Sequence, residues 1–210
     1  MENSNAQGLI LVISGPAGSG KGTVVDLIMK SAPNDFALSV SATTRSPRPG
    51  EVDGKSYHFI SRSDFESRIA AGQMLEYNYY CDNYYGTPAD YAKAVIDSGK
   101  NLILEIDVNG GMQVKKSYPE AVLIMLLPPS IEIQRQRLVH RDTETPDVIE
   151  RRVEKSKEEL KFVGVYDYVV YNYDGRTVDC MEDILSIVRS EKSAVRHLRD
   201  VEKRYLGNKD

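Results

Sequence analysis

Four runs of apolar residues alternate with stretches of helical periodicity along this chain of 210 residues. The runs occupy residues 9–13, 102–106, 121–127 and 168–171, and polar or turn-forming residues flank each of them. Continuous apolar runs of this length are typical of strands that are buried on both faces of a parallel sheet. The pattern therefore predicts a parallel sheet at the centre of the molecule.

Between and after these runs, apolar residues recur at the spacing of amphipathic helices. The predicted helices cover residues 21–30, 89–98, 131–139, 145–162 and 177–198. Several of them begin at Ser, Thr or Pro, which are common residues at helix starts. Strands that alternate with helices indicate an α/β layer architecture.

Two segments interrupt this alternation. Residues 39–90 hold short mixed segments rich in tyrosine, which predict a small antiparallel sheet and a brief helix near residues 64–71. Residues 128–159 are helical in pattern and dense in arginine. We therefore expect one compact core with two excursions, and the core comprises residues 1–38, 91–127 and 160–210.

Composition places the chain among globular proteins, with 41% hydrophobic and 28% charged residues. The formal net charge of -4 lacks the basic excess of a nucleic-acid-binding protein, and no apolar run is long enough to span a membrane. Cys81 and Cys180 are far apart in the sequence and show no metal-ligand spacing, so two free thiols are expected. We expect a cytoplasmic protein with no nucleic-acid or membrane partner.

The strongest chemical signal is a glycine-rich segment between the first apolar run and the first predicted helix. Glycines let the backbone curl so that successive N–H groups converge on phosphate oxygens, and the following helix adds its positive end. The lysine of the segment supplies charge to the β- and γ-phosphates. This P-loop pattern predicts a nucleoside triphosphate site formed by Gly15, Pro16, Ala17, Gly18, Ser19, Gly20, Lys21, Gly22 and Thr23.

One position departs from the usual P-loop pattern. Ser or Thr usually follows the lysine, whereas here Gly22 follows Lys21 and Thr23 comes one residue later. We expect magnesium to be held by Thr23 through a water molecule, or mainly by phosphate and water oxygens.

The remaining motifs resemble those of guanylate kinases, in the same order and over roughly residues 9–190. The matching segments are SVSATTRSPR at residues 39–48, GKSY at 54–57, Glu76, NYYGT at 83–87 and LEIDVNG at 104–110. The resemblance implies an α/β fold: a P-loop parallel-sheet core flanked by helices, with a small mixed α+β GMP-binding insertion and a helical lid. It also implies magnesium-dependent transfer of the γ-phosphoryl group of ATP to GMP, and to dGMP.

The resemblance assigns two sets of residues to GMP. Arg45, Arg48, Tyr57 and Tyr85 match the positions that hold its phosphate, and Ser41, Glu76, Thr87 and Asp107 match those that contact the base. Guanine carries two donors on its pairing edge, N1–H and the N2 amine, which a carboxylate accepts, whereas adenine presents an acceptor at N1. Glu105 receives a secondary role near magnesium or a phosphate-linked network.

The arginine-dense segment resembles the family's lid, which closes over the ATP phosphates. Lys21, Arg45, Arg137, Arg141 and Arg152 form the catalytic set that the resemblance implies. His140 and Asp142 flank Arg141 where the family usually has glycines, which puts the motion of the lid in question. Asn172 matches a family residue at the edge of the ATP site.

Two other functions remain open at this point. Guanylate-kinase-like modules of scaffold proteins bind peptides and do no chemistry, but they generally lack a working P-loop, whereas Gly15, Gly20 and Lys21 are present here. A P-loop kinase with another acceptor is the second alternative, and the residues assigned to GMP argue against it. Oligomeric state stays undecided, as does the role of the charged residues 190–210.

Overall fold

The computed structural model describes residues 7–140, 145–198 and 201–207. Its centre is a five-stranded sheet in the order β2-β7-β1-β8-β9, with every neighbouring pair parallel. The strands are β2 (Phe36–Leu38), β7 (Asn101–Glu105), β1 (Ile10–Ser14), β8 (Val122–Leu127) and β9 (Tyr168–Tyr171). The predicted parallel sheet is thus confirmed, and its edge strand β2 is an addition to the four predicted runs.

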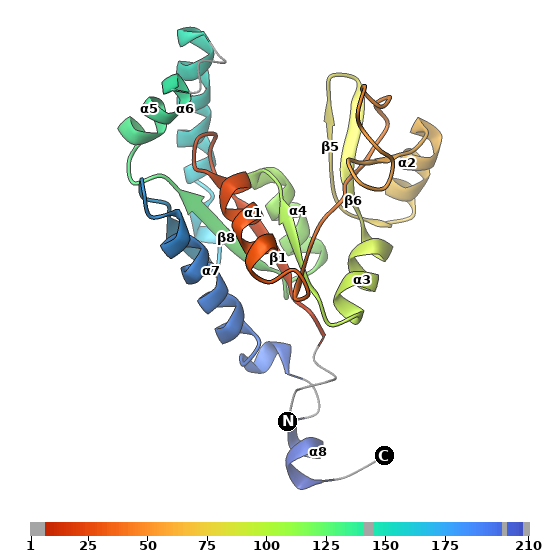
Figure 1. Ribbon diagram of the computed structural model, residues 1–210. Helices are drawn as coiled ribbons and strands as arrows, with labels where there is room; N and C mark the ends of the chain where they lie inside the picture. Colours follow the sequence, from red (N-terminus) through yellow and green to blue (C-terminus); the bar gives the residue numbers. More distant parts are fainter. Residues whose placement is uncertain (1–6, 141–144, 199–200, 208–210) are drawn as a thin grey trace.

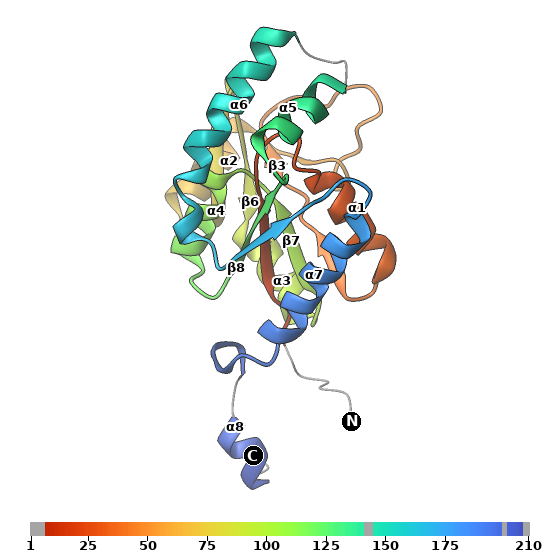
Figure 2. The same cartoon turned by 90° about the vertical axis from the view of Figure 1, so that its left-hand side faces the viewer.

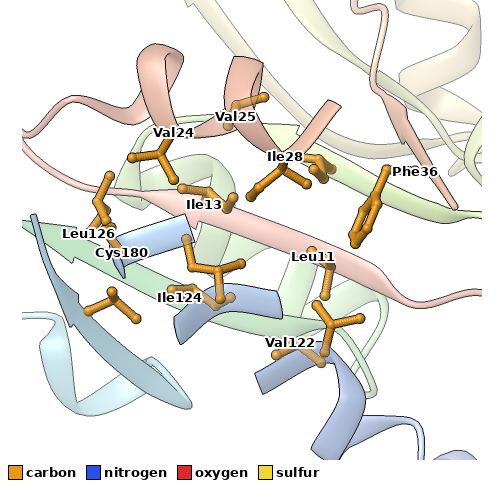
Figure 3. Packing of buried hydrophobic residues seen from close by; sticks show 14 of the residues in the cluster. Leu11, Ile13, Val24, Val25, Ile28, Phe36, Val122, Ile124, Leu126 and Cys180 are labelled. Atoms are coloured by element: carbon orange, nitrogen blue, oxygen red, sulfur yellow. The ribbon is translucent and has the colours of Figure 1, made fainter. Parts of the chain in front are cut away.

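Alternate residues of the strands point to opposite faces of this sheet and build two separate cores. Leu11 and Ile13 of β1 pack with helices α1 (Lys21–Ser31) and α7 (Thr177–Glu191) on one face (Figure 3). Buried contacts from Val24, Ile28, Ile184 and Val188 complete that core.

The opposite face of the sheet is covered by α3 (Ala89–Asp97) and α4 (Val108–Ser117). Ile10 and Val12 of β1 pack there with Ala92, Ile96 and Val114 of these helices. Because both faces are covered, the strands read as continuous apolar runs rather than as alternating ones.

A second sheet stands apart from the first, with the order β4-β3-β6-β5. Its strands are β4 (His58–Phe59), β3 (Ala42–Thr43), β6 (Asn83–Pro88) and β5 (Met74–Tyr80), and α2 (Arg62–Ala70) covers it. The expectation of a purely antiparallel sheet is wrong at one pair, because β3 and β4 run parallel. A parallel pair needs a long crossover, which residues 44–57 between these short strands supply.

Two helices, α5 (Ile131–His140) and α6 (Pro146–Leu160), form a hairpin at the upper left of Figure 1. Leu138, Ile149 and Val153 are buried between them, and Ala17 of the P-loop packs against this cluster. The second sheet stands on the other side of the molecule, at the upper right, and the view in Figure 2 shows α5 beside the P-loop end of α1.

The last predicted helix is shorter than expected, because α7 ends at Glu191 rather than continuing to Leu198. The carboxylate of Glu191 is 2% exposed and is bonded by Tyr168, Arg196 and His197. These contacts turn the chain back into a 3-10 helix, Val195–His197, so the regular helix stops. A short 3-10 helix, Val163–Val165, also precedes β9, and α8 (Val201–Leu206) follows beyond.

No helix within the described ranges combines the length and the apolar character needed to cross a bilayer. Cys81 is exposed and Cys180 is buried, and both are free thiols as expected.

Candidate active site

The P-loop connects β1 to α1 at the carboxyl end of the parallel sheet. Two of its glycines are required by close approach and by positive φ. A Cβ on Gly15 would stand 2.0 Å from the carbonyl oxygen of Leu126, and one on Gly20 would stand 2.4 Å from Asn172 Nδ2, with φ values of 152° and 89°. Larger residues would push the loop away from the ends of β8 and β9.

Lys21 begins α1, and its side chain folds back over the loop. Its Nζ donates to the carbonyl oxygens of Gly15 at 2.6 Å and Pro16 at 3.2 Å. The ammonium group therefore stands at the mouth of the loop, where the N–H groups of an α1 N-terminus also point.

Next to the loop lies a cavity of about 320 Å³, which we call the loop cavity. Its walls come from three elements: the P-loop and Lys21, the carboxyl end of β7 with Glu105 and Asp107, and the α6 face that carries Arg152. Partial burial raises the pKa of Glu105, and the charge of Lys21 opposes that rise. Cations and carboxylates thus face one another across the space that the strand ends leave open.

A second cavity of about 580 Å³, the outer cavity, lies on the other side of the loop. Thr23, Arg137 and Asn172 line it. Thr23 and Glu105, the two residues that the sequence associates with magnesium, therefore line different cavities, because Glu105 lines the loop cavity. Asn172 is buried and donates to the carbonyl oxygen of Ser19 at 2.9 Å, so it also fixes the loop.

The predicted lid arginines have different surroundings. The Arg137 guanidinium donates to Asp174 at 2.7 Å, to the carbonyl of Gly18 at 3.2 Å and to that of Asn172 at 2.7 Å. It thereby bridges the P-loop and the end of β9. Arg152 lines the loop cavity, whereas Arg141 lies outside the described residues.

The residues assigned to the base meet where the two sheets join. Glu76 on β5 is 6% exposed and accepts a hydrogen bond from Thr87 Oγ1 at 2.8 Å. Asp107 caps α4 by accepting from the Gly110 N–H at 2.9 Å. Burial raises the pKa of Glu76 to about 7, the Thr87 hydrogen bond opposes the rise, and the nearby charge of Asp107 adds to it. Two carboxylates therefore share one partly dry site.

Ser41 directly precedes β3, whose Ala42 is paired with Gly86 of β6. This antiparallel register brings Ser41 alongside Thr87, the residue that bonds Glu76. Three of the four side chains assigned to the base, those of Ser41, Thr87 and Glu76, thus come from the neighbouring strands β3, β6 and β5 or their ends.

The residues assigned to the acceptor phosphate form a second cluster on the small sheet. The rings of Tyr57 and Tyr85 lie edge to face, with centroids 6.1 Å apart, and the Arg45 guanidinium stands 5.5 Å from the Tyr57 ring centroid. Glu51 accepts from Arg45 at 2.8 Å and from the backbone N–H of Arg48 at 2.7 Å. These contacts lower the pKa of the Glu51 carboxyl and hold the arginine loop in shape.

Three residues of these clusters were missed by the sequence analysis: Glu51, Lys155 and Glu159. Lys155 and Glu159 line the loop cavity with Arg152, and burial raises the pKa of Glu159. Their spacing of three and four from one another and from Arg152 is the helical signal that could have found them. Glu51 carries no such signal, because only the folded loop brings it to Arg45.

A glycine-rich loop between a central parallel strand and a helix, with its lysine facing a polar cavity, defines a P-loop nucleotide-binding α/β protein. Comparison with known proteins narrows this class. A family model described as guanylate kinase matches residues 7–190. The chain belongs to the guanylate kinase family.

Individual relatives agree with this assignment. The guanylate kinase of Lactiplantibacillus plantarum is 46% identical over 202 residues, which cover 96% of this chain and 97% of the relative. That of Lactococcus lactis is 52% identical over 166 residues, 79% of this chain and 80% of the relative. A crystal structure of guanylate kinase from Anaplasma phagocytophilum superposes with a TM-score of 0.72 at 26% identity, covering 97% of this chain and 96% of that one.

Proposed function

We propose that this chain transfers the γ-phosphoryl group of ATP to GMP, forming ADP and GDP, and that it also accepts dGMP. The observation that carries the proposal is the position of the loop cavity. Lys21 and the P-loop stand at one side of it and Asp107 at another, and Asp107 is close enough to Glu76 to perturb its charge. A triphosphate at the loop would point toward a base site of two carboxylates.

In this proposal the parts of the molecule have separate roles: one binds ATP, one binds GMP and one closes over the ATP phosphates. The P-loop and Lys21 bind the ATP phosphates, and the outer cavity with Asn172 takes the adenosine part. Residues 39–90 bind GMP, with Arg45, Arg48, Tyr57 and Tyr85 at its phosphate. Residues 128–159 close over the ATP phosphates, to which Arg137, Arg141 and Arg152 add positive charge.

The chemistry needs no general base. The attacking oxygen belongs to the phosphate of GMP, which is already anionic near neutral pH. Catalysis then consists of placing two phosphates in line, offsetting their mutual repulsion and excluding water. Lys21, Arg45 and Arg152 are suited to that work because their positive charges can offset the charge of the two phosphates.

Magnesium is the cofactor that we propose, and the residues present fit it. A Cβ at Gly22 would lie 3.8 Å from Glu105 Oε1, so a hard carboxylate oxygen faces the position where other P-loops carry a hydroxyl. Glu105 is thus the residue best placed to hold the ion, directly or through water, and Thr23 is the predicted alternative. Bound magnesium would neutralise phosphate charge.

A substrate screen tests the proposal. ADP release is measured with the purified chain, ATP and one of GMP, dGMP, AMP, UMP or CMP. GMP and dGMP are expected to support turnover, and the other three to give less than about one hundredth of the GMP value of kcat/KM. Equal turnover of AMP and GMP would refute the assignment of the base site, and no turnover with any acceptor would favour a peptide-binding module.

Removal of the positive charge of Lys21 tests the proposed ATP site. Lys21→Ala is expected to lower kcat by about a hundredfold or more with the fold intact, because the charge that follows the migrating phosphoryl group is lost. The control is Lys30→Ala, an exposed lysine at the other end of the same helix. Turnover of Lys21→Ala close to that of the control would contradict the role of Lys21.

A further inference from the structure

Helix α4 lies against β5, which is one of the two edge strands of the small sheet. An edge strand leaves the backbone groups of alternate residues without a strand partner. At Tyr77 these groups are bonded by a side chain instead. The Tyr77 N–H donates to Gln113 Oε1 at 3.1 Å, and Gln113 Nε2 donates to the Tyr77 carbonyl at 3.0 Å.

This pairing acts directly on the backbone of a base-site residue. The Tyr77 N–H belongs to the peptide group that links Glu76 to Tyr77, and this group is planar. A bond from Gln113 therefore fixes the plane from which the Glu76 side chain departs. The carbonyl bond at the next peptide removes the remaining rotation about Tyr77.

The same face of α4 carries the other carboxylate. Asp107, Gly110 and Gln113 are spaced by three residues, so they follow one side of the helix. Asp107 caps the helix at Gly110 N–H, and a Cβ on Gly110 would lie only 3.3 Å from Glu76 Oε2. The Glu76 carboxylate thus lies against Gly110, midway between Asp107 and Gln113 on this side of the helix.

A bulge in β5 explains why the position of Glu76 relative to α4 needs an additional constraint. The register with β6 shifts between Met74 and Glu76, so Leu75 is the extra residue. Met74 is buried in the core of the small sheet, whereas Leu75 is buried in the core of the parallel sheet with Val114 of α4. The chain therefore passes from one core to the other immediately before Glu76, where a bulge alone leaves the strand direction adjustable.

We propose that Gln113 is a positioning residue for guanine recognition, which holds the Glu76–Tyr77 peptide against α4 and so fixes Glu76 relative to Asp107. This inference rests on the proposed function. Gln113 does not touch the nucleotide itself. Its effect is selective: it sets the acceptor for guanine's two donors and makes no contact with the P-loop, which lies between β1 and α1.

The test replaces the amide with a side chain of similar length that makes no hydrogen bond. Gln113→Met is compared with Lys116→Met, an exposed position on the same helix, and with Gln113→Glu, which keeps the acceptor for Tyr77 N–H but repels its carbonyl. Dissociation constants are measured for GMP, for ATP and for IMP, which has the N1–H of guanine but lacks its N2 amine.

For Gln113→Met we expect GMP to bind about tenfold more weakly, because two hydrogen bonds to the backbone are lost. We expect ATP binding within about twofold of wild type, and a preference for GMP over IMP that falls by about fivefold. Gln113→Glu is expected to be intermediate, and Lys116→Met to match wild type.

An unchanged Kd for GMP would overturn the proposal. So would a parallel loss for GMP, IMP and ATP, since that is the result of a general loss of structure rather than of positioning. If the wild-type chain bound GMP no better than AMP, the proposed function itself would fail, and this inference with it. If the wild type prefers GMP and the Kd of Gln113→Met for GMP is unchanged, the inference about Gln113 is refuted while the proposed function stands.

Discussion

At the scale of single residues, Glu76 is a carboxylate kept nearly out of contact with water. It is 6% exposed, has Thr87 as its hydrogen-bond donor and has a second acid nearby. Burial disfavours the ionised form, which is why the pKa rises to about 7. The folded protein therefore holds this proton over a pH range in which an unfolded chain has lost it.

The sign of the effect on stability follows from that difference. The folded-state pKa of Glu76 lies above the ordinary value of 4.5. The folded state binds more protons than the unfolded state between those two values, so this residue makes the protein less stable as pH rises from about 4.5 to about 7. The free-energy cost of burying the ionised Glu76 carboxylate is offset when guanine supplies hydrogen-bond donors to it.

GMP affinity is therefore expected to rise with pH as Glu76 ionises. The Kd for GMP should fall by about threefold to tenfold between pH 6 and pH 8, because only the ionised carboxylate accepts both guanine donors. Titration calorimetry of wild type and Glu76→Gln over this range measures it. The phosphate of GMP titrates equally in both proteins, so the difference between them isolates Glu76, and identical pH profiles would contradict the assignment.

Single residues were predictable from sequence where a local pattern defines their role. The P-loop and Lys21 are contiguous, so their geometry is encoded within a few positions. Gln113 and Glu51 were not predictable, because their partners, the backbone of Tyr77 and the side chain of Arg45, become neighbours only in the folded chain.

At the scale of elements, the buried side chain of Gln134 links both α5 and α6 to the P-loop, in addition to Arg137 and the cluster around Ala17. Gln134 is 2% exposed, and its Nε2 donates to the carbonyl of Ala17 at 3.0 Å and to Ser156 Oγ at 2.6 Å. The Ser156 hydroxyl in turn donates to the carbonyl of Arg152 at 2.7 Å. A short relay thus runs from the nucleotide loop to the helix that carries Arg152.

Breaking this relay should affect the ATP side of the reaction. Gln134→Ala is expected to lower the free energy of unfolding by about 2 kcal/mol, since two buried partners lose their donor. We expect the KM for ATP to rise by about fivefold and the KM for GMP to stay unchanged. Chemical denaturation and steady-state kinetics measure the two effects.

Val139→Ala serves as the control, because Val139 lies on the same helix and is 58% exposed. It should stay within about 0.5 kcal/mol of wild type. A rise in the KM for GMP as large as that for ATP in Gln134→Ala would show that the relay does not act locally.

Elements with clear periodicity and start signals were predicted well, and α4 shows where this fails. Gly110 and Gly111 disfavour a helix by propensity, so residues 108–117 were not predicted to be helical. A Cβ on Gly111 would lie 2.7 Å from Tyr166 Oη, and that close packing explains the glycine. The end of α7 was missed for a related reason, since it depends on contacts of Glu191 with Tyr168 of β9 and with His197 after the helix, which form only in the folded chain.

At the scale of the whole molecule, the two sheets differ greatly in how much apolar surface they bury. The parallel sheet has a core on each face, whereas among the described residues the buried cluster of the small sheet consists of Ala42, Phe65 and Met74. Apolar burial is the main stabilising contribution to folding, so the small sheet has less resistance to local opening.

Amide hydrogen exchange is expected to reflect this difference. Amides of β3, β5 and β6 should exchange at least about tenfold faster than those of β1, β7 and β8 in the nucleotide-free protein. Mass spectrometry of peptic fragments measures both sets in one sample. Equal protection of the two sheets would mean that they open only together, as a single cooperative unit.

The overall architecture was the most predictable feature, because apolar runs, helical spacing and the P-loop each report it independently. The presence of the second sheet was also predictable, but its strand directions were not: two-residue strands such as β3 and β4 are too short to show a pattern. How its residues meet those of the parallel sheet depends on the bulge at Leu75, which no local signal marks.

The hydrogen bond from Asn172 to Ser19 joins residues 153 positions apart. A ribosome releases the chain from its N-terminus, so the P-loop leaves the exit tunnel long before β8 and β9, the strands against which it is shaped. Until β8 is made, β1 lacks one of its two neighbours in the sheet. We therefore expect the growing chain to carry the complete P-loop motif well before it can bind ATP, and to gain that ability only after β9 and Asn172 have been made.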